Sequence, residues 1–172
     1  MENFSNEPID IDSLPRYQEI KLEPLHPNYW KVIVLNICIT ILFICTAAAL
    51  TFILNDETRA YIIHISLAIA VFSVFLLILF RLSFKRRGLA VRERDIIYSS
   101  GILSAKTTVI PFNRVQHVAL NEGVFSRMFK LGTLEVYTAG GATGNVKIHG
   151  LDLNQANNIK ELLSKRLNNG LR

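Results

Sequence analysis

The pattern of hydrophobic and polar positions divides the chain into a polar start, an apolar middle and a mixed second half. Residues 32–54 and 61–80 contain no Asp, Glu, Lys or Arg. A helix of about 20 apolar residues crosses a hydrocarbon core of roughly 30 Å, so each run predicts a membrane-spanning helix. The polar linker of residues 55–59 is short, which predicts that the two helices form an antiparallel hairpin.

The second half carries the pattern of a β-sheet. Short runs rich in β-branched and aromatic residues predict strands, and the glycine or polar residues between them predict turns. The predicted strands cover residues 96–103, 107–112, 115–120, 133–138 and 145–149, and residues 140–144 form a predicted hairpin turn.

The end of the chain predicts one amphipathic helix over residues 153–168. Asp152 precedes it as a candidate N-cap, and Gln155 follows three residues later, as in a capping box. Apolar residues recur at helical spacing, and we expect both Leu162 and Leu163 to face the sheet. Strands followed by one closing helix predict an α+β domain.

Composition sets the expected domain limits. We assign residues 1–27, which hold four of the five prolines, to a polar N-terminal tail. Residues 28–87 form the predicted transmembrane hairpin. Residues 88–172 hold all nine glycines, and we assign them to a cytoplasmic domain.

Charge predicts the topology. Residues 1–31 hold six acidic and three basic residues, whereas a basic cluster follows the second span. Lys and Arg near span ends remain in the cytoplasm, so we expect a two-span protein of the cell (inner) membrane with both termini cytoplasmic. The same cluster would attract anionic lipid. Its members are Arg81, Lys85, Arg86 and Arg87.

The reactive side chains predict neither catalysis nor a metal centre. Cys38 and Cys45 both lie in the first span, and His117 and His149 have no further ligands at metal-binding spacing. No Ser/His/Asp, Cys/His or paired-carboxylate set is placed for nucleophilic or acid–base chemistry. We therefore expect a non-enzymatic protein without cofactor or metal. Because the basic charge lies next to the membrane, we expect no nucleic-acid partner.

Two segments resemble a known family. Residues 110–118, with the sequence IPFNRVQHV, and residues 123–134, with GVFSRMFKLGTL, are similar to the YdbS-like bacterial pleckstrin-homology-like membrane proteins. The resemblance implies two spans followed by a seven-stranded, partly open antiparallel barrel or sandwich with a C-terminal capping helix. It also implies, as a partner, a larger membrane protein with several such domains. It carries over no catalytic residue.

Polar residues inside these segments form a candidate binding patch. They either satisfy hydrogen bonds of the sheet and its turns or hold a lipid headgroup or a peptide. The apolar stripe at 124–129 is also open to two interpretations, a plug of the barrel core or a surface helix that dips into the bilayer. The patch comprises Arg114, Gln116, His117, Arg127 and Lys130.

The pattern as a whole predicts a membrane-anchored binding or adapter protein that docks a partner membrane protein at the cytoplasmic face. The alternatives are an accessory subunit of a transport or envelope-stress system, and a reader of anionic lipid. A polyphosphate headgroup requires several converging Lys or Arg residues. The turn at 104–106 offers a single lysine, so we expect no stereospecific headgroup site in the domain.

Overall fold

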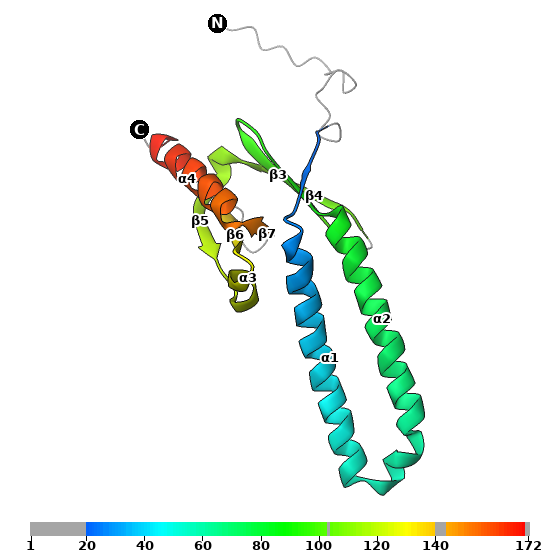
Figure 1. Ribbon diagram of the computed structural model, residues 1–172. Coiled ribbons are helices and arrows are strands. Elements are labelled where there is room, and N and C mark those ends of the chain that lie inside the picture. The colour runs from blue at the N-terminus through cyan, green and yellow to red at the C-terminus, as the bar shows by residue number, and fades with distance from the viewer. Residues whose placement is uncertain (1–19, 103, 140–143, 171–172) are drawn as a thin grey trace, which may run out of the picture.

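Two long antiparallel helices form the apolar part of the computed structural model, which describes residues 20–102, 104–139 and 144–170 (Figure 1). α1 spans Asn28–Leu54, α2 spans Ile62–Arg86, and the 3-10 helix η3, Asp56–Tyr61, joins them. Both α1 and α2 are long and apolar enough to cross a membrane. At 1.5 Å per residue each measures about 40 Å. The predicted runs lie within these helices, apart from Tyr61 at the end of η3.

The apolar side chains of the hairpin point outwards. Leu54 is 80% exposed, and Phe43 and Ile63 are exposed almost as fully. The buried apolar residues of α1 are Val32, Ile33 and Ile37, all in the part of the helix nearest the domain. An apolar surface of this extent requires lipid or a protein partner around it.

Two segments that the hairpin separates meet in the first sheet. β1 (Glu23–Pro24) precedes α1 and β2 (Gly88–Val91) follows α2, and the two pair antiparallel. β3 (Asp95–Ser100) and β4 (Lys106–Pro111) complete the order β1-β2-β3-β4. We expected residues up to 27 to form a tail, but Leu25, near the end of this segment, is a buried core residue of the domain.

The second sheet contains the remaining strands. β5 (Val115–Asn121), β6 (Leu131–Thr138) and β7 (Asn145–Asp152) pair antiparallel in that order. The 3-10 turn η4 (Phe112–Arg114) connects the two sheets, and the short helix α3 (Val124–Met128) lies between β5 and β6. Residues 140–143 of the predicted hairpin turn lie outside the described residues.

The C-terminal helix α4 (Leu153–Gly170) packs on the second sheet. Asp152 Oδ1 accepts a hydrogen bond from the Asn154 amide at 2.9 Å, which confirms the N-cap. Gln155 donates instead to Glu23, at 3.3 Å. Leu163 is buried as expected, but the expectation for Leu162 is wrong, since its side chain is 39% exposed. Successive residues of a helix point about 100° apart, so the two leucines do not share one face.

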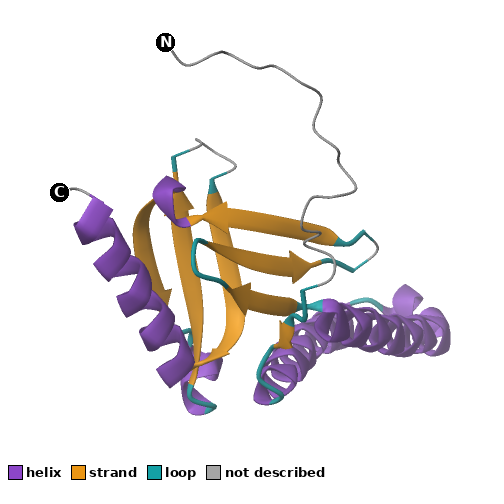
Figure 2. Cartoon of the chain, turned by 90° about the horizontal axis from the view of Figure 1, so that it is seen from above, coloured by secondary structure: helices purple, strands orange, loops and turns teal. Residues whose placement is uncertain are grey.

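One hydrophobic core lies between the two sheets and α4. The first sheet supplies Ile96, Tyr98 and Ile110, and the second sheet supplies residues such as Leu134 and Ile148. Seen from above, α4 lies along one side of the strands and the hairpin helices leave from the other (Figure 2). The sheets do not close into a barrel. This arrangement confirms the predicted α+β class, an open antiparallel assembly with a C-terminal helix behind an apolar hairpin.

Candidate functional site

Aromatic and basic side chains join the hairpin to the domain where α1 begins and α2 ends. The Phe84 ring centroid lies 6.3 Å from that of Tyr29 and 6.1 Å from that of Trp30. The Arg81 guanidinium lies 4.8 Å from the centre of the Trp30 ring. Arg87 Nη1 donates a hydrogen bond of 3.3 Å to the Tyr29 hydroxyl. We call these five residues the junction.

Gly150 allows the junction to pack directly on β7. A Cβ atom at this position would lie 2.4 Å from Cγ of Tyr29, and its φ of +75° belongs to the left-handed region that favours glycine. The Gly150 carbonyl accepts a hydrogen bond of 3.0 Å from the His26 amide. The segment just before α1 is therefore bonded to the second sheet through His26 and paired with the first sheet through β1.

The basic cluster is directed largely onto the protein itself. Arg81 lies over Trp30, Arg87 bonds to Tyr29, and Arg86 Nη1 donates to the Ile102 carbonyl at 3.0 Å. The first two contacts join the end of α2 to the start of α1, and the third joins it to the β3–β4 turn. Attraction of the cluster to anionic lipid stays a prediction.

The face of the second sheet turned away from α4 carries a row of polar side chains, which we call the polar outer face. Its centre is Glu135, whose carboxylate accepts a hydrogen bond of 2.6 Å from the Tyr137 hydroxyl and pairs with Lys147 Nζ at 2.7 Å. Thr133 Oγ1 and His149 Nδ1 are hydrogen-bonded at 3.1 Å. The polar outer face comprises His117, Asn121, Thr133, Glu135, Tyr137, Lys147 and His149.

Hydrogen bonds fix the charge states on this face. Donation from Lys147, Tyr137 and Asn121 lowers the pKa of Glu135 to about 2, and the carboxylate in turn raises the pKa of Lys147. Burial lowers the pKa of His149, with help from the positive charge of Arg87. At neutral pH the face therefore contains a buried, charged Glu135 paired with the exposed Lys147, beside a neutral imidazole.

A pocket of about 330 Å³ lies between this face and the start of α1. Val32, Ile33 and Asn36 of α1 form one wall, and Glu135 and His149 belong to the opposite wall. The Asn36 side chain donates to the Val32 carbonyl of its own helix at 2.9 Å. The pocket thus combines polar groups of the sheet with the apolar beginning of the first helix.

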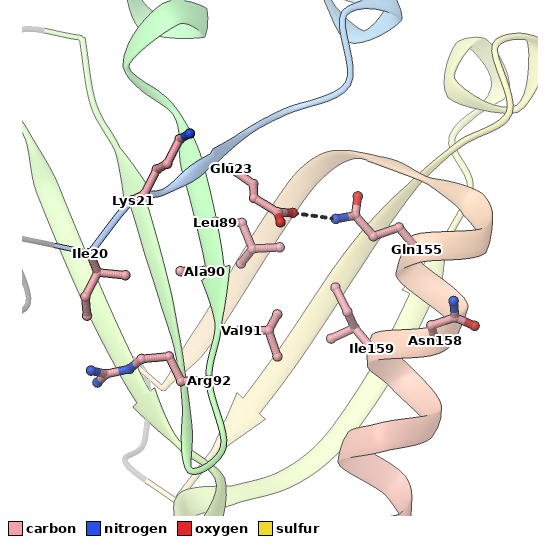
Figure 3. Close-up of a pocket in the computed structure, with 10 residues that line it drawn as sticks. All are labelled: Ile20, Lys21, Glu23, Leu89, Ala90, Val91, Arg92, Gln155, Asn158 and Ile159. Atoms are coloured by element: carbon pink, nitrogen blue, oxygen red, sulfur yellow. Dashed lines mark hydrogen bonds between the residues drawn. The ribbon is translucent and has the colours of Figure 1, made fainter.

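A second cavity, of about 540 Å³, marks the opening between the first sheet and α4 (Figure 3). β2 supplies Leu89 and Val91 on one side, and α4 supplies Asn158 and Ile159 on the other. The hydrogen bond from Gln155 to Glu23 crosses this opening. The cavity is the gap left where the two sheets do not close.

The structure does not gather the five residues of the predicted patch. Arg114 directly precedes β5, whereas Arg127 and Lys130 follow its other end, about 20 Å away along a strand of seven residues. A bulge between Val115 and His117 leaves both Gln116 and His117 exposed. His117 alone of the five joins the polar outer face, with its ring 5.5 Å from that of Tyr137. Binding by these residues stays a prediction.

The stripe at 124–129 divides between two environments. Phe125 and Phe129 are half-buried, but Val124 is 78% and Met128 69% exposed. The interpretation as a core plug is therefore wrong for Val124 and Met128, whereas Leu131, which continues the stripe, is fully buried. α3 instead lies beside the first turns of α1 (Figure 1), where Lys31 Nζ is 5.8 Å from the centre of the Phe129 ring.

Comparison with known proteins identifies one family. The family model described as "Bacterial PH domain" matches residues 32–167, which include nearly all of the hairpin and the domain. No curated protein and no solved structure matches the chain.

Proposed function

We propose that this chain, which belongs to the bacterial PH domain family, is a membrane-anchored adapter that holds a binding domain in a fixed orientation at the cytoplasmic face. PH-like domains are generally not catalytic, and a fold of this kind is a scaffold whose function depends on its surface sites. We further propose that it is of the YdbS-like type and that both termini are cytoplasmic.

One observation carries the proposal. The two chain ends of the hairpin enter the same sheet, with Glu23 opposite Leu89 and Pro24 opposite Gly88. A domain attached by a single tether would sample many orientations above the membrane. Here the paired strands and the junction of aromatic rings connect both helices to the domain, so the hairpin sets the direction in which the domain faces.

We assign the docking surface to the polar outer face. Lys147 is 55% exposed and offers its charge to a protein partner, while the buried Glu135 holds it in place; a charge fixed in this way sets the register of a partner. The adjacent pocket continues this surface to α1. A partner with its own membrane helices can therefore contact the polar outer face and the hairpin at once, which favours a membrane protein, such as a larger protein with several domains of this kind.

The geometry favours the adapter function over the recognition of anionic lipid. A lipid reader presents several free cationic groups to one headgroup, whereas Arg86 and Arg87 donate into the protein. The basic residues of the predicted patch also lie at opposite ends of β5.

Site-specific photocrosslinking of the full chain in its own membranes tests the proposal. A photoreactive residue in place of His117 samples the polar outer face, and one in place of Lys165 on α4 is the matched exposed control. We expect a discrete protein adduct at 117 that is absent at 165 and is lost in Glu135→Gln. Equal adducts at both positions, or none at 117, Asn121 and Lys147, would reject this docking surface.

The topology has a separate test. A reporter that is active only in the cytoplasm, fused after Arg172, should be active, while a fusion in the linker between the helices should not. Activity of an exported reporter after Arg172 would reject the cytoplasmic placement.

A further inference from the structure

Two apolar side chains on α3 have no protein cover. Among the described large apolar residues of the domain, Val124 is 78% and Met128 69% exposed, whereas Val91, Val109 and Leu162 reach about 40%. Val124 and Met128 are four residues apart, so they lie on one face of the helix. Val124 and Met128 together form a small exposed apolar ridge on α3.

α3 is held firmly by the domain. Phe125 and Phe129, on the other side of the helix, are half-buried. The chain then turns at Lys130, which has a φ of +55°, and its carbonyl accepts a hydrogen bond of 3.1 Å from the amide of Leu153 at the start of α4. Leu131, the next residue, is fully buried. The exposed ridge is therefore presented by a fixed turn.

The position of α3 beside α1 determines how deep α3 would lie relative to a bilayer that α1 spans. Gly123 and Ser126 line the same pocket as Val32, Ile33 and Asn36, the first residues of the charge-free run in α1. Asn36 is about 6 Å further along the helix axis than Val32. If α1 spans the bilayer, α3 lies at the level of the headgroups and the first carbons of the acyl chains.

The basic side chains around the ridge also favour a location at the level of the lipid headgroups. Arg127 and Lys130 are exposed on either side of Met128, and Lys31 of α1 lies over the Phe129 ring. Apolar side chains that enter the acyl boundary with basic side chains at the headgroup level are typical of segments that lie in the membrane interface. Amphipathic Lys and Arg side chains extend from that depth to the phosphates.

We propose that Val124 and Met128 insert into the cytoplasmic leaflet of the bilayer, so that α3 is a second membrane contact of the domain. This inference rests on the proposed membrane anchorage by the hairpin. The ridge extends the apolar surface of α1 sideways, and together the hairpin and α3 fix the tilt of the domain.

Depth-dependent fluorescence quenching of the full chain in phospholipid vesicles tests this inference. Cys38 and Cys45 are first replaced by Ala, and single cysteines at 124, 128, 43 or 165 then carry an environment-sensitive fluorophore. Position 43, at the midpoint of the charge-free run of α1, is the bilayer reference, and position 165, near the far end of α4, is the aqueous reference. Nitroxide lipids of two depths and aqueous iodide are the quenchers.

We expect the labels at 124 and 128 to be quenched several-fold more by a shallow nitroxide lipid than the label at 165, and several-fold less by iodide. Labels at 124 and 128 that behave like the one at 165, while the label at 43 is quenched by deep nitroxide, would overturn the inference and leave the anchorage intact. Protection from both quenchers would mean that protein covers α3, which also overturns it. Iodide access at position 43 would reject the anchorage and the inference together.

Discussion

The hairpin exposes its apolar side chains, whereas the domain buries them. In the hairpin, Leu50 and Phe43 are 57% and 72% exposed, and the helices enclose almost no core. In the domain, Leu134 and Ile148 are fully buried between the sheets and α4, and charged residues occupy the surface. The hairpin thus has the kind of surface that proteins present to lipid, and the domain has the kind that they present to water.

The difference explains the composition of the junction. A side chain at the boundary between the two solvents needs an apolar body and a polar end, which Tyr29, Trp30, Arg81 and Arg87 all have. Their mutual contacts hold the domain at the boundary. The junction is therefore the region through which the position of the hairpin determines the orientation of the domain.

The largest expected effect comes from removing a buried side chain of the domain. Leu134→Ala should lower the free energy of unfolding of the domain by about 2–5 kcal/mol, because it leaves a cavity in the core. The matched change Leu50→Ala, on the exposed side of α1, should stay within about 0.5 kcal/mol. Denaturant titration of the full chain in detergent micelles, monitored by amide hydrogen exchange in β6, measures the change in the free energy of unfolding for both variants. Equal effects of the two changes would contradict the division into two solvents.

A smaller effect is expected at the junction. Gly150→Ala forces a side chain into the left-handed region and into the ring of Tyr29, which should cost roughly 1–3 kcal/mol. Gly123→Ala is the matched control, because its φ is −67° and its nearest neighbour, Ser126 Oγ, is 3.8 Å from the added Cβ. Thermal unfolding by circular dichroism compares them. A Gly150→Ala variant as stable as Gly123→Ala would show that Tyr29 does not pack on β7.

The smallest expected effect concerns pH and the polar outer face. Burial lowers the pKa of His149 in the folded state, so stability should begin to fall as the pH drops below about 6.5, where the unfolded chain takes up a proton. Glu135 has a folded pKa of about 2, so a further loss should occur as the pH falls from about 4.5 towards 2. Lys147 is 55% exposed, so solvent screens the second loss.

Unfolding midpoints of the full chain between pH 3 and pH 8 measure the two steps. Glu135→Gln should remove the lower step and keep the upper one. A lower step of unchanged size in that variant would mean that other carboxylates cause it.

The hairpin and most strands could be predicted because their signals are local. A charge-free run, or an alternating segment such as residues 133–138, can be recognised from the local sequence alone. β1 and β2 carry no such signal, since β1 has two residues, one of them Pro24, and β2 has four. Their pairing depends on the hairpin, which brings residues 23 and 89 together.

The polar outer face could not be predicted, because its contacts depend on strand register. Glu135 meets Lys147 and His117 meets Tyr137 across strand pairs whose alignment includes two bulges. In isolation each of these residues is an ordinary polar position of a strand. The strand predicted over residues 115–120 is present as β5, but the bulge decides which of its side chains share a face.

We propose that the hairpin and the domain form one body at the membrane. A pulsed electron-paramagnetic-resonance distance measurement in lipid nanodiscs tests this, with spin labels at positions 50 and 165 of a chain whose Cys38 and Cys45 are replaced by Ala. We expect one narrow distance distribution, which broadens in Gly150→Ala and not in Gly123→Ala. A broad distribution in the parent chain, typical of a domain on a flexible tether, would contradict it.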